Sequence, residues 1–524
     1  MKKGALKKVI ALFLVFVLII ILKPYDKAAK AEYFVGRNFM KNNVPFDKKL
    51  SEIYMLGAHD ALTYNITLNI DTSQQASEDG GDLQYLPLLV NNVKYAKAQD
   101  TDAKTLLENG VRYFDIRLSY DQSSGKWRSS HSFFAGEFAE EAAKIKEFLD
   151  ENKGEIVILD FQWVYDSRAQ DDPSTSASEK GYGNANSYEE IRRIMLNLGL
   201  WNYVYNTQNK YPNELTYGQV TNNGTESKVI ILTKATNRAS TSTSSYYPQA
   251  MWRGYYKSQA DNARLRSTWH NVSRLTNLIS GINSEANTIA STTTYNKMFR
   301  VMQAQTNTVV DLSRLSINLV DLIGDAPQIH KGVYEHESFY SWLEKMPIYM
   351  VDYATDRTQV TSKNPDMVRT NQHVGPFCEV VIKDLAYKNR GNFSKSVNGI
   401  QVLGDNYLVP LSVDVSASRQ DFAGDITFKN VEGKTVEKFN INLVSPQNTV
   451  VEPLGPLTVR LPLNKMQDPS KVLVLREEDG EYEEVVPRNK DSSYVTFDTD
   501  KLGAFVLVEV EKVREADIFF IYAP

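Results

Sequence analysis

The sequence predicts an α/β protein, an irregular TIM-type (β/α) barrel followed by an all-β, Ig-like sandwich domain. From about residue 52 to residue 355, short apolar runs alternate with helical patterns, which is typical of a parallel sheet or barrel. Charged residues follow several of these runs, where a barrel gathers its functional groups. After residue 377, short apolar runs are separated by turns, as in a β-sandwich.

The first residues have the pattern of a secretory signal peptide. Four lysines precede the apolar run 9–22, and Ala29-Lys-Ala31 follows as a small-residue cleavage site. As a helix the run spans roughly 21 Å, less than the roughly 30 Å hydrocarbon core of a bilayer. We therefore expect a signal peptide over residues 1–31 and a mature protein that is secreted or lies at the extracellular surface. An uncleaved N-terminal anchor is the alternative.

Charge and cysteine content limit the partners. The signal peptide carries seven of the 59 basic side chains and one of the 64 acidic ones, so the mature chain has a formal net charge of −11. Nucleic acid is excluded as an expected partner, and contact with an anionic membrane must be local and transient. Cys378 is the only cysteine, so a large core must replace internal disulfides. We expect a monomer.

Six apolar runs are predicted as barrel strands, and Phe138, Ala142, Ile145 and Leu149 share one face of a helix between the second and third. The strands are residues 53–56, 111–118, 156–161, 229–232, 299–303 and 348–353. Polar loops follow at 166–187 and 240–245. Aromatic residues within 246–256 follow the second loop, and either pack the barrel rim or rest at a membrane interface.

The predicted domains are a barrel over 32–360, a linker over 361–376 and an all-β module over 377–524. The linker is polar and ends at Gly375-Pro376. Runs such as 472–475 and 505–508, separated by turns, indicate the β module. A binding or spacer role is the default for such a module.

The second predicted strand carries charge. Asp115 and Arg117 are two residues apart, so both side chains point to the same side of the strand. An internal ion pair bracing the barrel would explain them structurally. Further chemistry-bearing residues follow other strands, however: His59 and Asp60 after the first, His131 after the second, and Asp352 in the last.

Together these side chains suit phosphodiester chemistry. Two histidines can act as base and acid around a phosphodiester, and an arginine between them can stabilise charge at phosphorus. Asp60 and Asp352 can orient the histidines. His270, His330, His336 and His373 show no partner at interpretable spacing, so we expect surface or packing roles for them.

Residues 45–360 resemble the bacterial phosphatidylinositol-specific phospholipase C family and its X-domain relatives. The resemblance is carried by five segments: Gly57-Ala-His-Asp60, Phe114-Asp-Ile-Arg117, His131, Glu155-Ile-Val-Ile-Leu159 and Met350-Val-Asp-Tyr353. It implies a lyase reaction that converts phosphatidylinositol to diacylglycerol and inositol 1,2-cyclic phosphate. It makes His59 the base with Asp352 its partner, His131 the acid assisted by Asp60, and Arg117 the phosphate ligand.

The chain departs from the family where the headgroup is recognised. Gln162 and Trp163 stand where an active-site lysine is expected, Lys234 replaces an arginine, and Ser267-Thr-Trp269 replaces an Asp-x-Tyr pair. These residues, with Asp115, are the expected substrate contacts. Another phosphodiester with a neighbouring hydroxyl therefore stays open as substrate.

No metal or other cofactor is expected, because metal-dependent relatives carry a second carboxylate where this chain has Arg117. Two alternatives remain: a barrel that binds phosphoinositide or glycan-linked inositol without turnover, and another lipid phosphodiesterase, such as a phospholipase D-type enzyme that cyclises its substrate.

Overall fold

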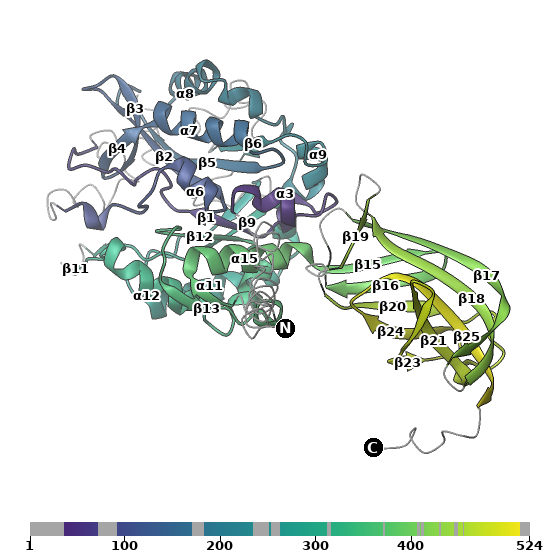
Figure 1. Ribbon diagram of the computed structural model, residues 1–524. Coiled ribbons are helices and arrows are strands. Elements are labelled where there is room, and N and C mark those ends of the chain that lie inside the picture. Colours follow the sequence, from purple (N-terminus) through teal and green to yellow (C-terminus); the bar gives the residue numbers. More distant parts are fainter. Residues whose placement is uncertain are drawn as a thin grey trace, which may run out of the picture.

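The computed structural model describes residues 36–71, 92–169, 183–233, 251–252, 263–311, 316–369, 373–405, 409, 413–428, 431–444, 449–453 and 455–513. Figure 1 shows an α/β part, coloured purple to green, followed along the chain by an all-β part, coloured green to yellow. The predicted signal peptide lies outside the described residues. Within the described ranges, no helix combines the length and the apolar composition needed to cross a membrane.

The α/β part is built on a ten-stranded, mainly parallel sheet. Its main path is β7-β6-β5-β2-β1-β12-β9-β8, in which every neighbouring pair is parallel, and β3 and β4 continue from β2 as antiparallel strands. The strands are β1 Met55–Ala58, β2 Val111–Asp121, β3 Lys126–His131, β4 Phe133–Glu137, β5 Ile156–Tyr165, β6 Lys228–Thr233, β7 Met251–Trp252, β8 Leu265–Ser267, β9 Phe299–Gln303 and β12 Ile348–Val351. The α/β class is thus confirmed, whereas closure into a TIM-type barrel stays a prediction.

All six predicted strands are present; β9 has the predicted ends, and the other five have shifted ends. The clearest shift is at β1, which starts at Met55 because the preceding residues form a 3₁₀ turn, Leu50–Glu52. β5 is buried along its whole length, which explains its nearly continuous apolar sequence. Of the strands that were not predicted, β7 and β8 are only two and three residues long, too short for a sequence pattern to develop.

Helices pack against this sheet and complete its core. The predicted helix is α7, and its residues Phe138, Ala142, Ile145 and Leu149 are all fully buried. The helices are α3 Phe39–Asn43, α6 Ala103–Glu108, α7 Phe138–Glu151, α8 Ala185–Asn197, α9 Tyr217–Thr221, α11 Leu275–Ala290, α12 Leu322–Tyr334, α13 Phe339–Lys345, α14 Pro365–Arg369 and α15 Phe377–Arg390. One large buried cluster contains side chains from both the strands and the helices.

The structure corrects the predicted linker. Residues 361–376 include α14 and strand β14, Val374–Pro376, which pairs with β13, Gln359–Thr361. The first part of the predicted β module is helix α15, and Pro376, which suggested a linker, is its N-cap residue. The apolar side chains of α15 belong to the core of the α/β part: Phe377, Val380, Val381, Ile382, Leu385, Ala386 and Tyr387. The change of architecture therefore comes at Gly391, not at the predicted residue 377.

The C-terminal part contains two antiparallel sheets. Five strands pair in the order β15-β16-β20-β24-β23, and six pair as β17-β18-β25-β21-β22 with β19 on β18. Buried residues of both sheets share one large hydrophobic cluster, in which Phe497 of β24 packs 5.1 Å from Phe505 of β25 between ring centres. A smaller cluster lies on β21 and β25. The strands are β15 Asn392–Val397, β16 Ile400–Asp405, β17 Asp414–Phe428, β18 Val431–Val444, β19 Val450–Val451, β20 Leu457–Pro462, β21 Val472–Glu478, β22 Glu481–Val485, β23 Asn489–Lys490, β24 Tyr494–Thr499 and β25 Gly503–Val513. An Ig-like sandwich remains a prediction.

The packing of α15 predicts where the chain can be cut. Burial of each large apolar side chain contributes about 1.5–3 kcal/mol, and a whole domain is stable by only about 5–15 kcal/mol. We expect a chain covering 36–391 to unfold cooperatively by circular dichroism, and one covering 36–376 to lose the cooperative transition. Equal melting temperatures for the two chains would contradict the assignment of α15 to the α/β core.

Candidate active site

The candidate site lies where strands β1 and β12 end, beside the middle of β2. These strands are parallel neighbours, so residues at their C-terminal ends meet at one edge of the sheet. His59 and Asp60 directly follow β1, Arg117 lies within β2, and Asp352 directly follows β12. His131 is the last residue of β3, which pairs with β2. The structure thus brings together all five residues predicted to be catalytic.

His59 is held by Asp352. Its Nδ1 lies 2.7 Å from Asp352 Oδ1, and its Nε2 lies 3.0 Å from Arg117 Nη2. Because the carboxylate accepts the Nδ1 proton, Nε2 is the nitrogen left for proton transfer. Burial disfavours the imidazolium, but the carboxylates of Asp60 and Asp352 outweigh it and raise the pKa of His59 to about 9. His59 is therefore a stronger base than free imidazole.

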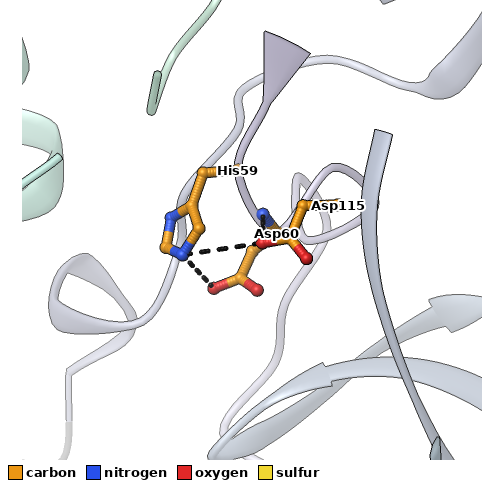
Figure 2. Close-up of side chains that lie close together, drawn as sticks. All are labelled: His59, Asp60 and Asp115. Carbon is orange, nitrogen blue, oxygen red and sulfur yellow. Dashed lines mark hydrogen bonds and ion pairs between the residues drawn. The ribbon is translucent and has the colours of Figure 1, made fainter. Parts of the chain in front are cut away.

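Asp60 lies at the centre of a charge cluster that contains Arg117, His59 and His131. It is buried, and its Oδ1 lies 2.5 Å from Arg117 Nε while its Oδ2 lies 3.6 Å from His59 Nε2 and 3.4 Å from His131 Nδ1. Burial works against the carboxylate, yet Arg117 and both histidines lower the pKa of Asp60. Figure 2 shows its carboxyl group beside His59 and Asp115.

His131 completes the pair of histidines. Its ring centre is 6.4 Å from that of His59, and the two rings are nearly perpendicular at 76°. Its Nδ1 lies 2.8 Å from the main-chain oxygen of Ala96, closer than the predicted partner Asp60 at 3.4 Å. Burial is the main reason that the pKa of His131 is lowered. A bound phosphate anion would favour the protonated ring, which is the form that a general acid needs.

Three side chains here have the chemistry of metal ligands. One ligand atom each from His59, Asp60 and Asp115 lies within 4.8 Å of the others. The guanidinium of Arg117 reaches the same atoms, because its Nη2 is 3.0 Å from His59 Nε2 and 3.8 Å from Asp115 Oδ2. A divalent cation among these ligands would therefore lie directly against a fixed positive charge, and the residues fit the guanidinium better.

Two of the predicted substrate contacts are built into the same cluster. Asp115 is buried, and burial, with only partial compensation by Arg117, raises its pKa to about 6. The amide of Gln162, oriented to satisfy its neighbours, donates to Asp115 Oδ2 at 3.0 Å. Trp163 is 9 % exposed and stacks on Tyr165 with 6.1 Å between ring centres. Gln162 thus reaches the site through Asp115.

The remaining predicted contacts differ in position. Ser267 is the last residue of β8 and accepts a hydrogen bond of 2.7 Å from Gln303 Nε2. Trp269 is 37 % exposed in the loop that follows. Lys234 lies outside the described residues, as do most of the aromatic residues within 246–256.

Sequence reasoning missed Gln99, a fully buried residue that joins two strand ends. Its Nε2 lies 2.8 Å from the main-chain oxygen of His59 and 3.1 Å from that of Val351, and its Oε1 accepts from the nitrogen of Ala354 at 3.1 Å. A glutamine in a loop carries no signal in one sequence. His330, expected to be a packing or surface residue, is buried and contacts the main chain of Asp352.

Comparisons with known proteins agree with the predicted resemblance. The chain is 30% identical over 129 residues to the variant-surface-glycoprotein phospholipase C of Trypanosoma brucei brucei, covering 22% of this chain and 36% of that protein. It is 27% identical over 142 residues to a PI-PLC X-box domain-containing protein of Dictyostelium discoideum, covering 27% of this chain and 18% of that protein. The chain resembles the phosphatidylinositol-specific phospholipases C. It matches about a third or less of the length of these relatives, and no family model matches it.

Solved phosphatidylinositol-specific phospholipases C were also found. The Staphylococcus aureus enzyme has a TM-score of 0.41 and 16% sequence identity, covering 66% of this chain and 97% of its own. The Listeria monocytogenes enzyme has a TM-score of 0.39 and 15% identity, covering 68% of this chain and 98% of its own.

The contact between Asp352 and His59 predicts a pKa change. Asp352→Asn removes a negative charge that stabilises the imidazolium, so the pKa of His59 should fall, by about 1 to 2. NMR titration can follow this directly, because the chain has only six histidines. Asp150→Asn, in an exposed pair with Lys146, is the matched control. A rise or no change in the pKa of His59 would contradict the assigned role of Asp352.

Proposed function

We propose that this protein is a phosphodiesterase that cleaves phosphatidylinositol-type lipids to diacylglycerol and inositol 1,2-cyclic phosphate. The observation that carries the proposal is the convergence of two oriented histidines and Arg117 on the buried carboxylate of Asp60. Each histidine is held at Nδ1, His59 by Asp352 and His131 by Ala96, so each has Nε2 available for proton transfer. A buried structural ion pair would not need two such histidines.

In the proposed reaction, His59 Nε2 takes the proton from the inositol 2-hydroxyl, whose oxygen attacks phosphorus. The bond from phosphorus to the glycerol oxygen breaks, and His131 gives that oxygen its proton. Arg117 stabilises the charge that builds up on the phosphoryl oxygens. Its position among His59, Asp60 and Asp115 supports a reaction without a divalent cation.

The headgroup is the least constrained part of the proposal. Ser267 and Gln162 are uncharged and already paired with Gln303 and Asp115. These neutral groups suit hydroxyl contacts better than charge contacts, so another phosphodiester with a neighbouring hydroxyl is the second candidate substrate. The curated relative with 30% identity is named as acting on a glycoprotein, which adds lipid anchors of proteins to the substrates worth testing.

A transient contact with a lipid surface is part of the proposal. Apolar side chains are exposed in segments that follow strands β1, β8 and β9: Leu68 at 48 %, Ile70 at 38 %, Trp269 at 37 %, Leu319 at 44 % and Ile323 at 45 %. In a TIM-type barrel such segments surround the active-site face. We also propose secretion through the segment 1–31, an all-β sandwich of binding or spacer function, and a monomeric state.

Phosphorus NMR tests the proposed reaction. Residues 32–524, incubated with phosphatidylinositol in mixed micelles with EDTA, should give a cyclic inositol phosphate signal. His59→Ala and His131→Ala should each lower turnover by about 10² to 10⁴, because each removes one acid or base group. Activity only after calcium addition would contradict the proposed role of Arg117, and absence of product under both conditions would favour another headgroup or a binding function.

Arg117→Lys separates charge from geometry. Lysine keeps the positive charge but lacks the planar fork, which here contacts Asp60 with one nitrogen and His59 with another. We expect kcat to fall by about 10² or more, as for loss of a donor to a developing oxyanion. Asp60 should remain paired, so the melting temperature should change less than in Arg117→Met. Near-normal kcat in Arg117→Lys would mean that charge alone suffices.

A further inference from the structure

His330 is a buried histidine that contacts the main chain of Asp352, a residue of the candidate site. It lies on α12 and is 1 % exposed. Its Nε2 is 2.7 Å from the main-chain oxygen of Asp352, and its Nδ1 is 2.9 Å from Asp356 Oδ2. Both partners are hydrogen-bond acceptors, so both contacts are satisfied only when each ring nitrogen carries a proton. Although burial opposes it, the contact with His330 lowers the pKa of Asp356.

His330 is itself held in place. Its ring stacks on Phe377 with 4.0 Å between ring centres and 6° between ring planes. Phe377 begins α15 and belongs to the hydrophobic core. The nitrogen of Cys378 donates to the main-chain oxygen of Asp356 at 3.0 Å, so the same helix also fixes the partner of His330. The His330 side chain therefore has little freedom to move.

Asp352 needs support of this kind. It follows the last residue of β12, so the strand ladder ends before it. The next residue, Tyr353, has φ of +47°, a backbone conformation that bulky residues adopt only when their surroundings impose it. The nitrogen of Tyr353 donates to Ala98 at 2.7 Å, and His330 holds the carbonyl group on the preceding residue. These contacts fix the turn from which the Asp352 carboxylate reaches His59.

We propose that His330 is a positioning residue, whose Nε2–H holds the main chain of Asp352 so that its carboxylate stays on Nδ1 of His59. The expected effect of His330 on kcat rests on the proposed function, whereas its expected effect on the pKa of His59 does not. A purely structural role for His330 would change stability and leave the titration of His59 in folded protein unchanged.

The test compares His330→Met with His330→Gln. The two side chains are similar in length and volume, but only glutamine can donate to the Asp352 oxygen. In NMR titrations, the pKa of His59 should fall in His330→Met and stay near its wild-type value in His330→Gln. With phosphatidylinositol, kcat should fall about tenfold to a hundredfold in the methionine variant with KM little changed, because misplacement by about 1 Å costs about that much. Glutamine should restore most of kcat.

His336→Met is the matched control. That ring stacks on Trp342 with 4.5 Å between centres and accepts a hydrogen bond from the Ser338 nitrogen, without contacting Asp352. It should leave the pKa of His59 and kcat unchanged. The proposal is overturned if His330→Met resembles His336→Met, or if the glutamine and methionine variants behave alike.

Two further results distinguish failure of the positioning role from failure of the proposed function. If His330→Met shifts the pKa of His59 but wild-type protein turns over no phosphodiester, the positioning role stands and the proposed function fails. If the substituted proteins do not fold, ¹⁵N spectra of the wild-type histidines decide the question. A proton on Nε2 of His330 near neutral pH supports the proposal, and its absence overturns it.

Discussion

The candidate site depends on the ion pair between Asp60, which is fully buried, and Arg117, whose side chain is 11 % exposed. Each charge would be costly alone in this setting, and removal of one partner of a buried pair destabilises a protein by about 3 to 5 kcal/mol. Asp60 stands between Arg117 and both histidines, so a single carboxylate sets the electrostatic environment of every group that could act on a substrate. Its φ of +44° shows that the backbone turns sharply directly after β1 to place it there.

The same cluster separates the properties of the two histidines. His59 faces two carboxylates and its pKa is raised, whereas His131 is oriented by a neutral carbonyl group and its pKa is lowered. Two groups of one residue type thus acquire different proton affinities through their neighbours alone. In the free protein this asymmetry favours a proton on His59 over one on His131, whereas the proposed reaction starts from the opposite distribution. A bound anion beside His131 would favour the protonated form that the acid needs.

Much of this arrangement could be predicted from the sequence. Arg117, His59 and Asp352 stand out because charged residues within or directly after buried strands need an explanation, and parallel strands bring their ends together. Gln99, Ala96 and His330 could not be found this way. Their hydrogen bonds to the site involve a main-chain oxygen on one side, and every residue type provides that group. The predicted linker over 361–376 and β module from 377 were wrong for a related reason. A polar stretch and a Gly-Pro pair indicate a break in a pattern, but not whether the helix that follows returns to the earlier core.

That helix has a consequence for the C-terminal part. α15 ends at Arg390 and β15 begins at Asn392, so a single glycine separates the two architectures. The guanidinium of Arg390 is buried and donates to Asn43 and to the main-chain oxygen of Val409, one on each side of this junction. The all-β part is therefore not an interchangeable attachment on a flexible tether. Grafting it onto another protein would remove the contacts through which Arg390 joins the two parts.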